Sequence, residues 1–187
     1  DLHAGLLGGA VANPINVVGK LMADRTEADG RITITGFYYD VEDVSPAERE
    51  MIAQIPFDEA KYKAAIGVDE LFGEKGYSTL ERNSCRPSFD ICGIWGGYIE
   101  EGTKTIIPAR ASAKISMRLV PNQDFRKIAK LFERYFRAIA PRSVKVDVRF
   151  LHGGAPYVSP TDLPAYKAAE KAVEAPIGKK HLPFSSG

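Results

Sequence analysis

Histidines and carboxylates are the side chains that most often hold catalytic metals, and this sequence offers few of them at useful spacings. Its three histidines, His3, His152 and His181, form neither a His-x-Asp nor a His-x-x-x-His pair, the spacings that bring two metal ligands together. Glu100 and Glu101 are adjacent, but the glycines around them predict a solvated hairpin turn. Because a di-zinc site needs about five or six ligands, we expect this chain by itself to bind no catalytic metal.

Side chains suited to covalent catalysis or to phosphate binding also lack the surroundings they would need. No Gly-x-Ser-x-Gly occurs, and neither Cys85 nor Cys92 has a histidine close by in the sequence. The glycine-rich stretch 5–9 lacks the Lys-Ser/Thr of a phosphate-binding loop and has no strand before it. Two cysteines do not make a disulfide framework, so we expect reduced thiols and a cytoplasmic protein.

The remaining candidates for a binding role are a histidine and an arginine. His3 is a lone histidine beside a glycine-rich turn, where such residues are usually solvated or structural. Arg118 is predicted on the outward face of a strand, and its guanidinium group matches the geometry of a carboxylate. The same placement would also suit an ordinary surface salt bridge. Thr105 has no distinctive surroundings, so the residue pattern alone leaves these alternatives open.

The strand that carries Arg118 shows the clearest alternation in the sequence. The stretch 104–120 is strand-like and is broken at Pro108, which predicts an edge or a bulge there. Its later apolar face consists of Ala113, Ile115, Met117 and Leu119, and its polar face consists of Ser112, Lys114, Ser116 and Arg118. An amphipathic helix is predicted next, with Asn122 as its N-cap and Pro141 as its end.

The other predicted elements are marked by caps, turns and alternation. Further strands are predicted at 31–35, 88–94 and 144–150. Further helices are predicted at 13–24, 45–53, 58–66 and 161–174, and we interpret 37–78 as a mostly surface-lying helical insertion. This order is accommodated most economically by an α+β fold, an antiparallel four-stranded sheet with helices on one face, as in ferredoxin-like domains.

Length and composition limit the classes of protein that fit. The 187 residues suffice for one domain, or one domain with an extra piece, and 44% hydrophobic residues can form a real core. A net charge of +1 provides no general attraction to nucleic acid or to an anionic membrane. The outward strand face also lacks the aromatic residues of an RNA-binding sheet, and the apolar runs are too short to cross a bilayer. The chain opens on Asp1 without a methionine or a leader, so we expect a piece of a longer polypeptide.

Five motifs occur in order along the chain: Asp-Leu-His-Ala-Gly-Leu-Leu-Gly-Gly at 1–9, Gly-Ile-Trp-Gly-Gly at 93–97, Lys-Thr-Ile-Ile-Pro at 104–108, Ile-Ser-Met-Arg-Leu-Val-Pro-Asn at 115–122 and His-Gly-Gly at 152–154. Together they resemble the lid domain of the di-zinc metallopeptidases that include carnosinase and the cytosolic non-specific dipeptidases. Ala4 replaces the usual serine of the first motif, which leaves His3 in place.

The resemblance implies a division of labour. In that family a separate catalytic domain holds two zinc ions, and two lids pair in a homodimer. By resemblance, His3 would reach the partner's active site and stabilise an oxyanion, while Arg118 would bind the carboxylate of a dipeptide or short peptide, with Thr105 hydrogen-bonding nearby. Residues 1–154 would form the lid, and 155–187 would return to a catalytic domain that lies outside this sequence. The chain alone would then be inactive.

Two other functions fit the same residues. The chain would also suit a non-catalytic dimerisation or binding module. Lids of N-acyl-amino-acid amidohydrolases, such as aminoacylase and succinyl-diaminopimelate desuccinylase, are similar too, so the sequence leaves the substrate open between dipeptides and acylamino acids. Zinc is the metal that the resemblance implies, and the residues of this chain do not distinguish it from manganese or cobalt.

Overall fold

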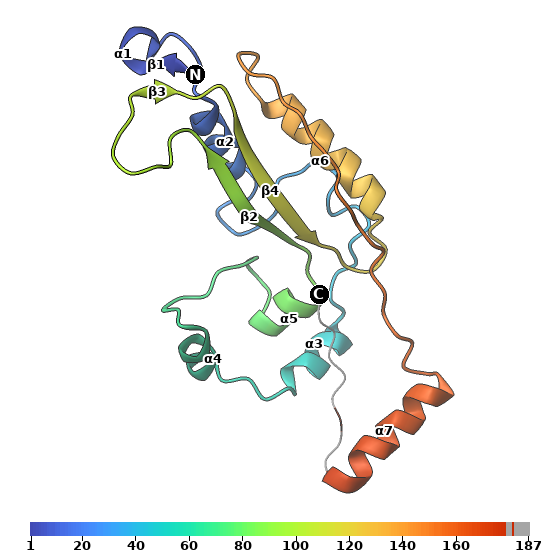
Figure 1. The fold of residues 1–187 in the computed structure, drawn as a ribbon. Helices are drawn as coiled ribbons and strands as arrows, with labels where there is room; N and C mark the ends of the chain where they lie inside the picture. The colour runs from blue at the N-terminus through green and yellow to red at the C-terminus, as the bar shows by residue number, and fades with distance from the viewer. Residues whose placement is uncertain (179–180, 182–187) are drawn as a thin grey trace.

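The computed structural model describes residues 1–178 and residue 181, and its fold is α+β (Figure 1). The strands form two small antiparallel sheets, one pairing β1 (Leu2–His3) with β3 (Ile106–Ile107) and the other pairing β2 (Ser88–Gly96) with β4 (Ala111–Arg118). The helices of the described residues are α1 (Ala4–Leu7), α2 (Pro14–Ala23), α3 (Pro46–Ala53), α4 (Glu59–Ile66), α5 (Thr79–Ser84), α6 (Phe125–Ile139) and α7 (Pro164–Ile177).

The larger sheet differs from the predicted one, because it has two strands in place of four. Residues 31–35 were predicted to be a strand, but this region contributes only an isolated bridge between Thr26 and Ile32. The apolar residues of the stretch are nevertheless buried, with Ile32 5% and Ile34 2% exposed. Burial of alternate side chains therefore explains the pattern without a ladder of strand hydrogen bonds.

Residues 144–150 are the second departure from the predicted sheet. They are extended, yet in the described part of the chain they pair with no strand. They run instead alongside α6 (Figure 1), where Arg137 Nη1 donates a hydrogen bond to the carbonyl oxygen of Val146 at 2.6 Å. Phe150 stacks on Phe125 with ring centroids 6.0 Å apart. The segment therefore contacts α6 through a backbone hydrogen bond and an aromatic pair, and its alternation did not correspond to a strand of the larger sheet.

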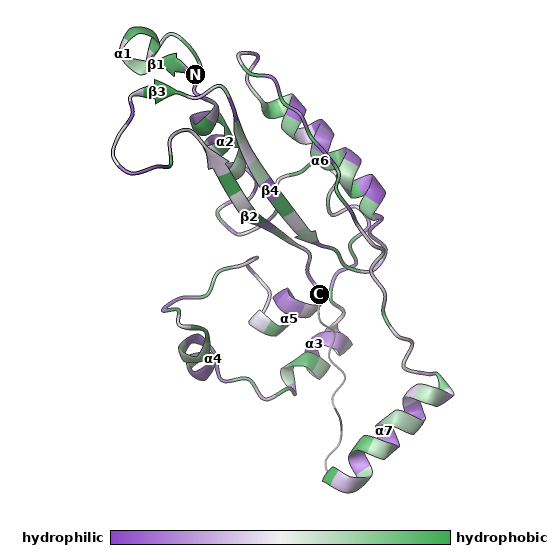
Figure 2. Cartoon of the chain, viewed as in Figure 1, coloured by the Kyte–Doolittle hydropathy of each residue, from purple (hydrophilic) through white to green (hydrophobic). Residues whose placement is uncertain are grey.

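The hydrophobic core lies between the β2–β4 sheet and the helices α2 and α6. Its buried members are Leu21, Met22, Ile32, Ile34, Phe37, Phe89, Ile128 and Phe136. Phe89 of β2 stacks on Phe132 of α6 with centroids 6.0 Å apart, and Figure 2 shows that hydrophobic and hydrophilic residues separate along α6. The predicted apolar side of β4 packs on this core, as expected, so that Lys114, Ser116 and Arg118 on its other side are exposed.

The N-terminus of α6 is capped by Asp124, and the prediction of Asn122 as the cap is wrong. Asp124 Oδ1 accepts a hydrogen bond from the backbone amide of Arg126 at 2.7 Å. Asn122 is in the left-handed region with φ 71°, within the turn that precedes the helix. The buried Gln123 closes that turn, because its Oε1 accepts from the Val120 amide at 3.0 Å. Asparagine tolerates left-handed backbone better than most residues, which explains why it suits this turn position.

The helices predicted between residues 13 and 66 are present, and one further helix lies before β2. Asn13, Ser45 and Asp58 cap α2, α3 and α4 as the sequence indicates, and α4 has no buried residue. The helix α5 was not predicted, although Ser78 and Glu81 form a capping box at its start. Serine followed three residues later by glutamate is the sequence signal that would have identified it.

A buried arginine holds this insertion against the sheet. Arg86 lies just before β2, and its Nε and Nη2 each donate to a carboxylate oxygen of Glu74 at 2.8 Å. Its guanidinium group lies 4.3 Å from the ring centroid of Tyr77 and 5.2 Å from that of Tyr38. Burial would lower the pKa of Arg86, but the hydrogen bonds and charge of Glu74 raise it above its ordinary value. This bidentate contact anchors the insertion from within.

Beyond the hydrophobic core the chain continues into α7, which Figure 1 shows apart from the sheet and α6. It starts at Pro164 without a side-chain cap from Leu163. None of its residues is buried, and Val173 and Ile177 are 51% and 61% exposed. Within residues 1–178 and 181, α7 therefore buries no face against the sheet or α6. Positions 179–180 and 182–187 of the predicted return segment lie outside the described residues. No helix within the described part has the length and hydropathy needed to span a membrane.

Candidate functional site

The pairing of β1 with β3 brings two of the three predicted site residues together. His3 is opposite Ile106 in the register, so it is one position from Thr105. The backbone amide of Ala4, the residue after His3, donates a hydrogen bond to the carbonyl oxygen of Thr105 at 3.0 Å. Both His3 and Thr105 are exposed. The two residues are far apart in sequence, and they share one exposed edge.

The start of the chain is fixed to this edge by a side chain as well. Asp1 Oδ1 accepts a hydrogen bond from the backbone amide of Ala109 at 2.9 Å. Ala109 lies beyond β3, so the bond extends the two-residue ladder by one further link. A pair of two-residue strands is short for a sheet, and this contact gives β1 an attachment on each side of Leu2 and His3.

The imidazole of His3 has a defined orientation. His3 is the N-cap of α1, and its Nδ1 accepts a hydrogen bond from the backbone amide of Gly5 at 3.1 Å. A histidine side chain at an N-cap satisfies one of the free amides at the start of a helix. The Nδ1 atom of His3 therefore has a structural role, because it caps α1. It leaves Nε2 available to another molecule.

Arg118 lies away from this edge, at the far end of β4. It pairs with Ser88 in the register, whereas Ala111 at the other end of β4 pairs with Gly96. Eight strand residues rise by roughly 23 Å, and Figure 1 shows β1 and β3 beyond the start of β4, opposite its arrowhead. The structure therefore groups His3 with Thr105 and separates both from Arg118.

The guanidinium group of Arg118 faces solvent on the outward side of the sheet. Asp90 is the acid nearest to it in register on that side, and its carboxylate accepts from the Ser88 hydroxyl at 2.8 Å. Among the ion pairs within residues 1–178 and 181, none includes Arg118. The alternative of an ordinary surface salt bridge is thus not realised in the part of the chain that the structure describes.

A bulge in β2 adds an aromatic residue to the outward side that the sequence pattern did not predict. The register shifts between Ile91 and Gly93, at Cys92. Trp95 consequently faces outward, is 49% exposed, and lies with its ring centroid 5.7 Å from Lys114 Nζ. Simple alternation cannot locate such a bulge, although a glycine inside a strand is its usual sign.

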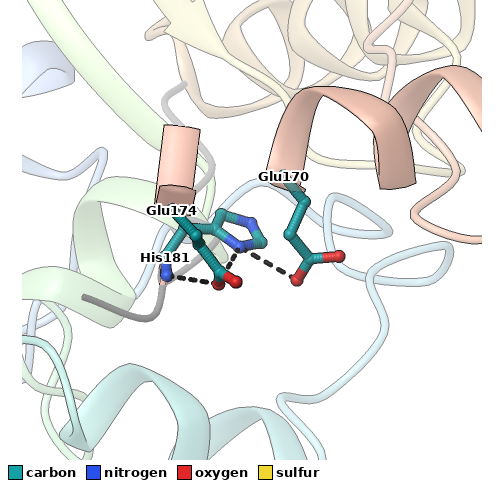
Figure 3. A group of neighbouring side chains, drawn as sticks. All are labelled: Glu170, Glu174 and His181. Atoms are coloured by element: carbon teal, nitrogen blue, oxygen red, sulfur yellow. Dashed lines mark hydrogen bonds and ion pairs between the residues drawn. The ribbon is translucent and has the colours of Figure 1, made fainter. Parts of the chain in front are cut away.

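A carboxylate–histidine group on α7 is the one cluster of three potential metal ligands in residues 1–178 and 181 (Figure 3). His181 Nδ1 is 3.0 Å from Glu170 and 3.6 Å from Glu174. Its Nε2 lies 3.0 Å from the hydroxyl of Tyr166, and its backbone amide donates to Glu174 at 2.8 Å. The Nε2 atom is thus within hydrogen-bond distance of Tyr166, whereas Nδ1 lies near both carboxylates but forms no hydrogen bond within the described residues.

This group does not fit the two metal ions that the resemblance implies. Two zinc ions need about five or six ligands, with a carboxylate bridging them, whereas the cluster offers three side chains. The contacts instead join α7 to His181. The position of the catalytic metal ligands outside this chain stays a prediction.

Comparison with known proteins agrees with the arrangement of these elements. The peptidase dimerisation domain of the M20 family matches residues 1–144. The Cys-Gly metallodipeptidase of Saccharomyces cerevisiae is 29% identical over 183 residues, which cover 95% of this chain and 38% of that protein. The Beta-Ala-His dipeptidase of Homo sapiens is 28% identical over 181 residues, which cover 95% of this chain and 36% of that protein.

A solved structure shows the same relationship in three dimensions. The structure of human carnosine dipeptidase 1 superposes with a TM-score of 0.82 at 26% identity, over 99% of this chain and 40% of that one. The chain therefore spans about two fifths of the length of these relatives. The matched range 1–144 contains both sheets, the core helices and all three predicted site residues. This chain belongs to the M20 peptidase dimerisation domain family.

Proposed function

We propose that this chain is the dimerisation and lid part of a metal-dependent dipeptidase, in which each lid completes the active site of the partner copy. One observation carries the proposal: the β1–β3 pair sets His3 beside Thr105 at an exposed edge, at a distance from Arg118. Relatives of this chain bear the names of dipeptidases, and the matched domain is a dimerisation domain. Both facts support a paired, peptide-binding lid.

The size of the substrate supports a site shared between copies. Two extended residues span at most about 7 Å, whereas β4 alone rises by roughly 23 Å between the two groups of site residues. One dipeptide therefore cannot contact Arg118 and His3 of the same chain. A homodimer removes the difficulty, because a two-fold axis can set Arg118 of one copy opposite His3 and Thr105 of the other.

Each side chain then has a role that matches its chemistry. Arg118 binds the terminal carboxylate of the peptide through its planar pair of N–H donors. His3 donates a hydrogen bond to the oxyanion that forms when the peptide carbonyl is attacked, and Thr105 hydrogen-bonds the substrate beside it. We assign residues 1–154 to the lid and 155–187 to a return segment, in a cytoplasmic protein. Two zinc ions, held by a part of the polypeptide outside this sequence, would supply the activation of water.

The proposal is tested with the intact zinc-loaded polypeptide and a panel of dipeptides and N-acyl amino acids. His3→Ala should lower kcat by on the order of a hundredfold, the size of the loss of one oxyanion donor. Arg118→Ala should mainly raise KM, because it removes the contact to the carboxylate. Arg149→Ala is the matched control, since this exposed arginine forms an ion pair with Asp147, two residues away, and its loss should change neither constant.

The outcomes separate the alternative functions. Cleavage of N-acyl amino acids without cleavage of dipeptides would identify the lid of an amidohydrolase. Absence of both activities would favour a dimerisation module without catalysis. If dipeptides are cleaved and both variants behave as the wild type does, the proposed roles of His3 and Arg118 are wrong.

A further inference from the structure

We infer that Gly5 is the positioning residue for His3: its backbone amide fixes the proton of the neutral imidazole on Nε2, and its missing side chain leaves the ring room to make that bond. The inference rests on the proposed function, in which His3 is a hydrogen-bond donor to the substrate. It adds a second residue to that site, one that itself touches neither substrate nor metal.

The hydrogen bond from Gly5 decides which ring nitrogen carries the proton. The amide nitrogen of Gly5 is 3.1 Å from His3 Nδ1 and can only donate. Nδ1 must therefore be the unprotonated nitrogen, and the neutral ring carries its hydrogen on Nε2. Within residues 1–178 and 181, no hydrogen bond to Nε2 of His3 is formed. The lid thus presents an N–H donor, the species that an oxyanion requires.

The space beside the ring explains why residue 5 is glycine. A Cβ at position 5 would lie 2.8 Å from Cε1 and 3.1 Å from Nδ1 of His3, which is closer than non-bonded carbon atoms approach. The backbone conformation does not require glycine at this position, because Gly5 is not among the glycines with positive φ. Alanine is the best helix former, and it would suit α1 at this position if the imidazole were absent.

Alanine at position 5 must therefore displace the imidazole. The backbone of α1 can stay as it is, since alanine is compatible with it, and the clash is relieved by rotation of the His3 side chain. Rotation separates Nδ1 from the Gly5 amide and releases the constraint on the tautomer. The Nε2–H donor then points away from the place that it occupies in the wild type. An oxyanion donor works within a narrow range of distances, so turnover should fall.

The first readout is the tautomer itself. Nitrogen chemical shifts of the 187-residue chain labelled with 15N-histidine distinguish a protonated from an unprotonated ring nitrogen, and His3→Gln identifies the signals of His3. The wild type should show Nδ1 unprotonated and Nε2 protonated in a single tautomer. Gly5→Ala should show a mixture of the two tautomers. A wild-type ring protonated on Nδ1, or a Gly5→Ala ring identical to the wild type, would overturn the inference.

The second readout is catalysis by the intact zinc-loaded polypeptide. Gly5→Ala should lower kcat by on the order of tenfold, less than the complete loss of the donor in His3→Ala, and should leave KM within about twofold. Gly19→Ala is the matched control: Gly19 lies inside α2, nothing lies within 4 Å of its added Cβ, and it has no positive φ. Its turnover should equal that of the wild type.

The two claims fail in different ways. If His3→Ala leaves turnover unchanged, the proposed function and the inference built on it are both wrong. If His3→Ala is impaired while Gly5→Ala retains the wild-type kcat, the proposed function stands and Gly5 is not a positioning residue.

Discussion

Ala4 donates its backbone hydrogen bond to the carbonyl oxygen of Thr105 at 3.0 Å, next to the His3–Ile106 pair of the β1–β3 register, and so helps to join two segments that the sequence keeps far apart. Because Ala4 follows His3 directly, the bond fixes the position from which the imidazole projects. The pairing of β1 with β3 is therefore more than a local detail. It places His3 and Thr105 at one exposed edge and leaves Arg118 at the far end of β4.

The contact between Asp1 and Ala109 should be measurable as protection of β1. Asp1→Ala removes the acceptor of the Ala109 amide, which lies at 2.9 Å. The loss of one such bond is worth about 1 kcal/mol, so the amides of Ala4 and Ala109 should exchange with solvent roughly fivefold faster. Hydrogen exchange followed by NMR tests this. Asp69→Ala, in the exposed linker after α4, is the control, and equal exchange rates in both variants would contradict the role of Asp1.

The Arg86–Glu74 pair should dominate the stability of the insertion. The two side chains are 4% and 10% exposed, so that Arg86→Met leaves a buried carboxylate without its partner. Such a loss costs about 3–5 kcal/mol, which urea denaturation would detect as a lower midpoint. Arg149→Met removes an exposed pair whose members are 83% and 73% exposed, and should cost at most about 1 kcal/mol. Similar costs for the two variants would show that the buried pair is no anchor.

Alkaline pH should destabilise the fold through Tyr38. Burial raises the pKa of this phenol above its ordinary value of 10.0, so the folded chain holds the proton more tightly than the unfolded chain does. Its contribution is fully present below about pH 10 and is lost as the pH rises through the folded-state pKa. The free energy of unfolding should therefore fall above pH 10.

Tyr38→Phe provides the test of this pH dependence. The variant loses the hydroxyl that accepts from the buried Ile32 amide at 3.0 Å, so it should be less stable by about 1–3 kcal/mol at pH 8. Its free energy of unfolding should also fall less than that of the wild type between pH 8 and pH 10.5. The difference in free energy of unfolding between the two proteins should therefore become smaller. Tyr157→Phe, at a position 80% exposed, is the control. A constant difference between Tyr38→Phe and the wild type across this range would contradict the assignment.

Local signals in the sequence predicted the local structure well. The caps at Asn13, Ser45 and Asp58 start the helices that were expected, because capping depends on a few adjacent residues. The alternation at 111–118 identified which side of β4 is buried, and so identified Arg118 as outward-facing. The family resemblance was also confirmed.

Pairing between distant segments could not be predicted in the same way. The strands β1 and β3 have two residues each, too few to show any period. The residues at 144–150 show strand-like alternation, yet they pack along α6. The bulge at Cys92 and the constraint of Gly5 on His3 arise from backbone geometry, which the order of residue types does not record. The sequence therefore predicted His3, Thr105 and Arg118 as separate candidates. It did not predict that His3 and Thr105 lie together and that Arg118 lies apart from them.

Mixing two impaired variants of the intact zinc-loaded polypeptide tests the shared site most directly. His3→Ala and Arg118→Ala homodimers each lack one contact in every active site. In a heterodimer, one site receives the intact His3 from one copy and the intact Arg118 from the other. Random exchange of subunits should therefore restore about a quarter of the wild-type activity at a substrate concentration below KM, since half of the dimers are mixed and half of their sites are complete.

The matched control is a mixture of His3→Ala with Thr105→Ala. Because these residues belong to the same edge of one chain, every site in that heterodimer lacks one of them, and activity should not recover. Recovery in the first mixture and none in the second is the result that a site shared between two lids predicts. No recovery in the first mixture, with subunit exchange demonstrated, would mean that His3 and Arg118 do not meet across the dimer.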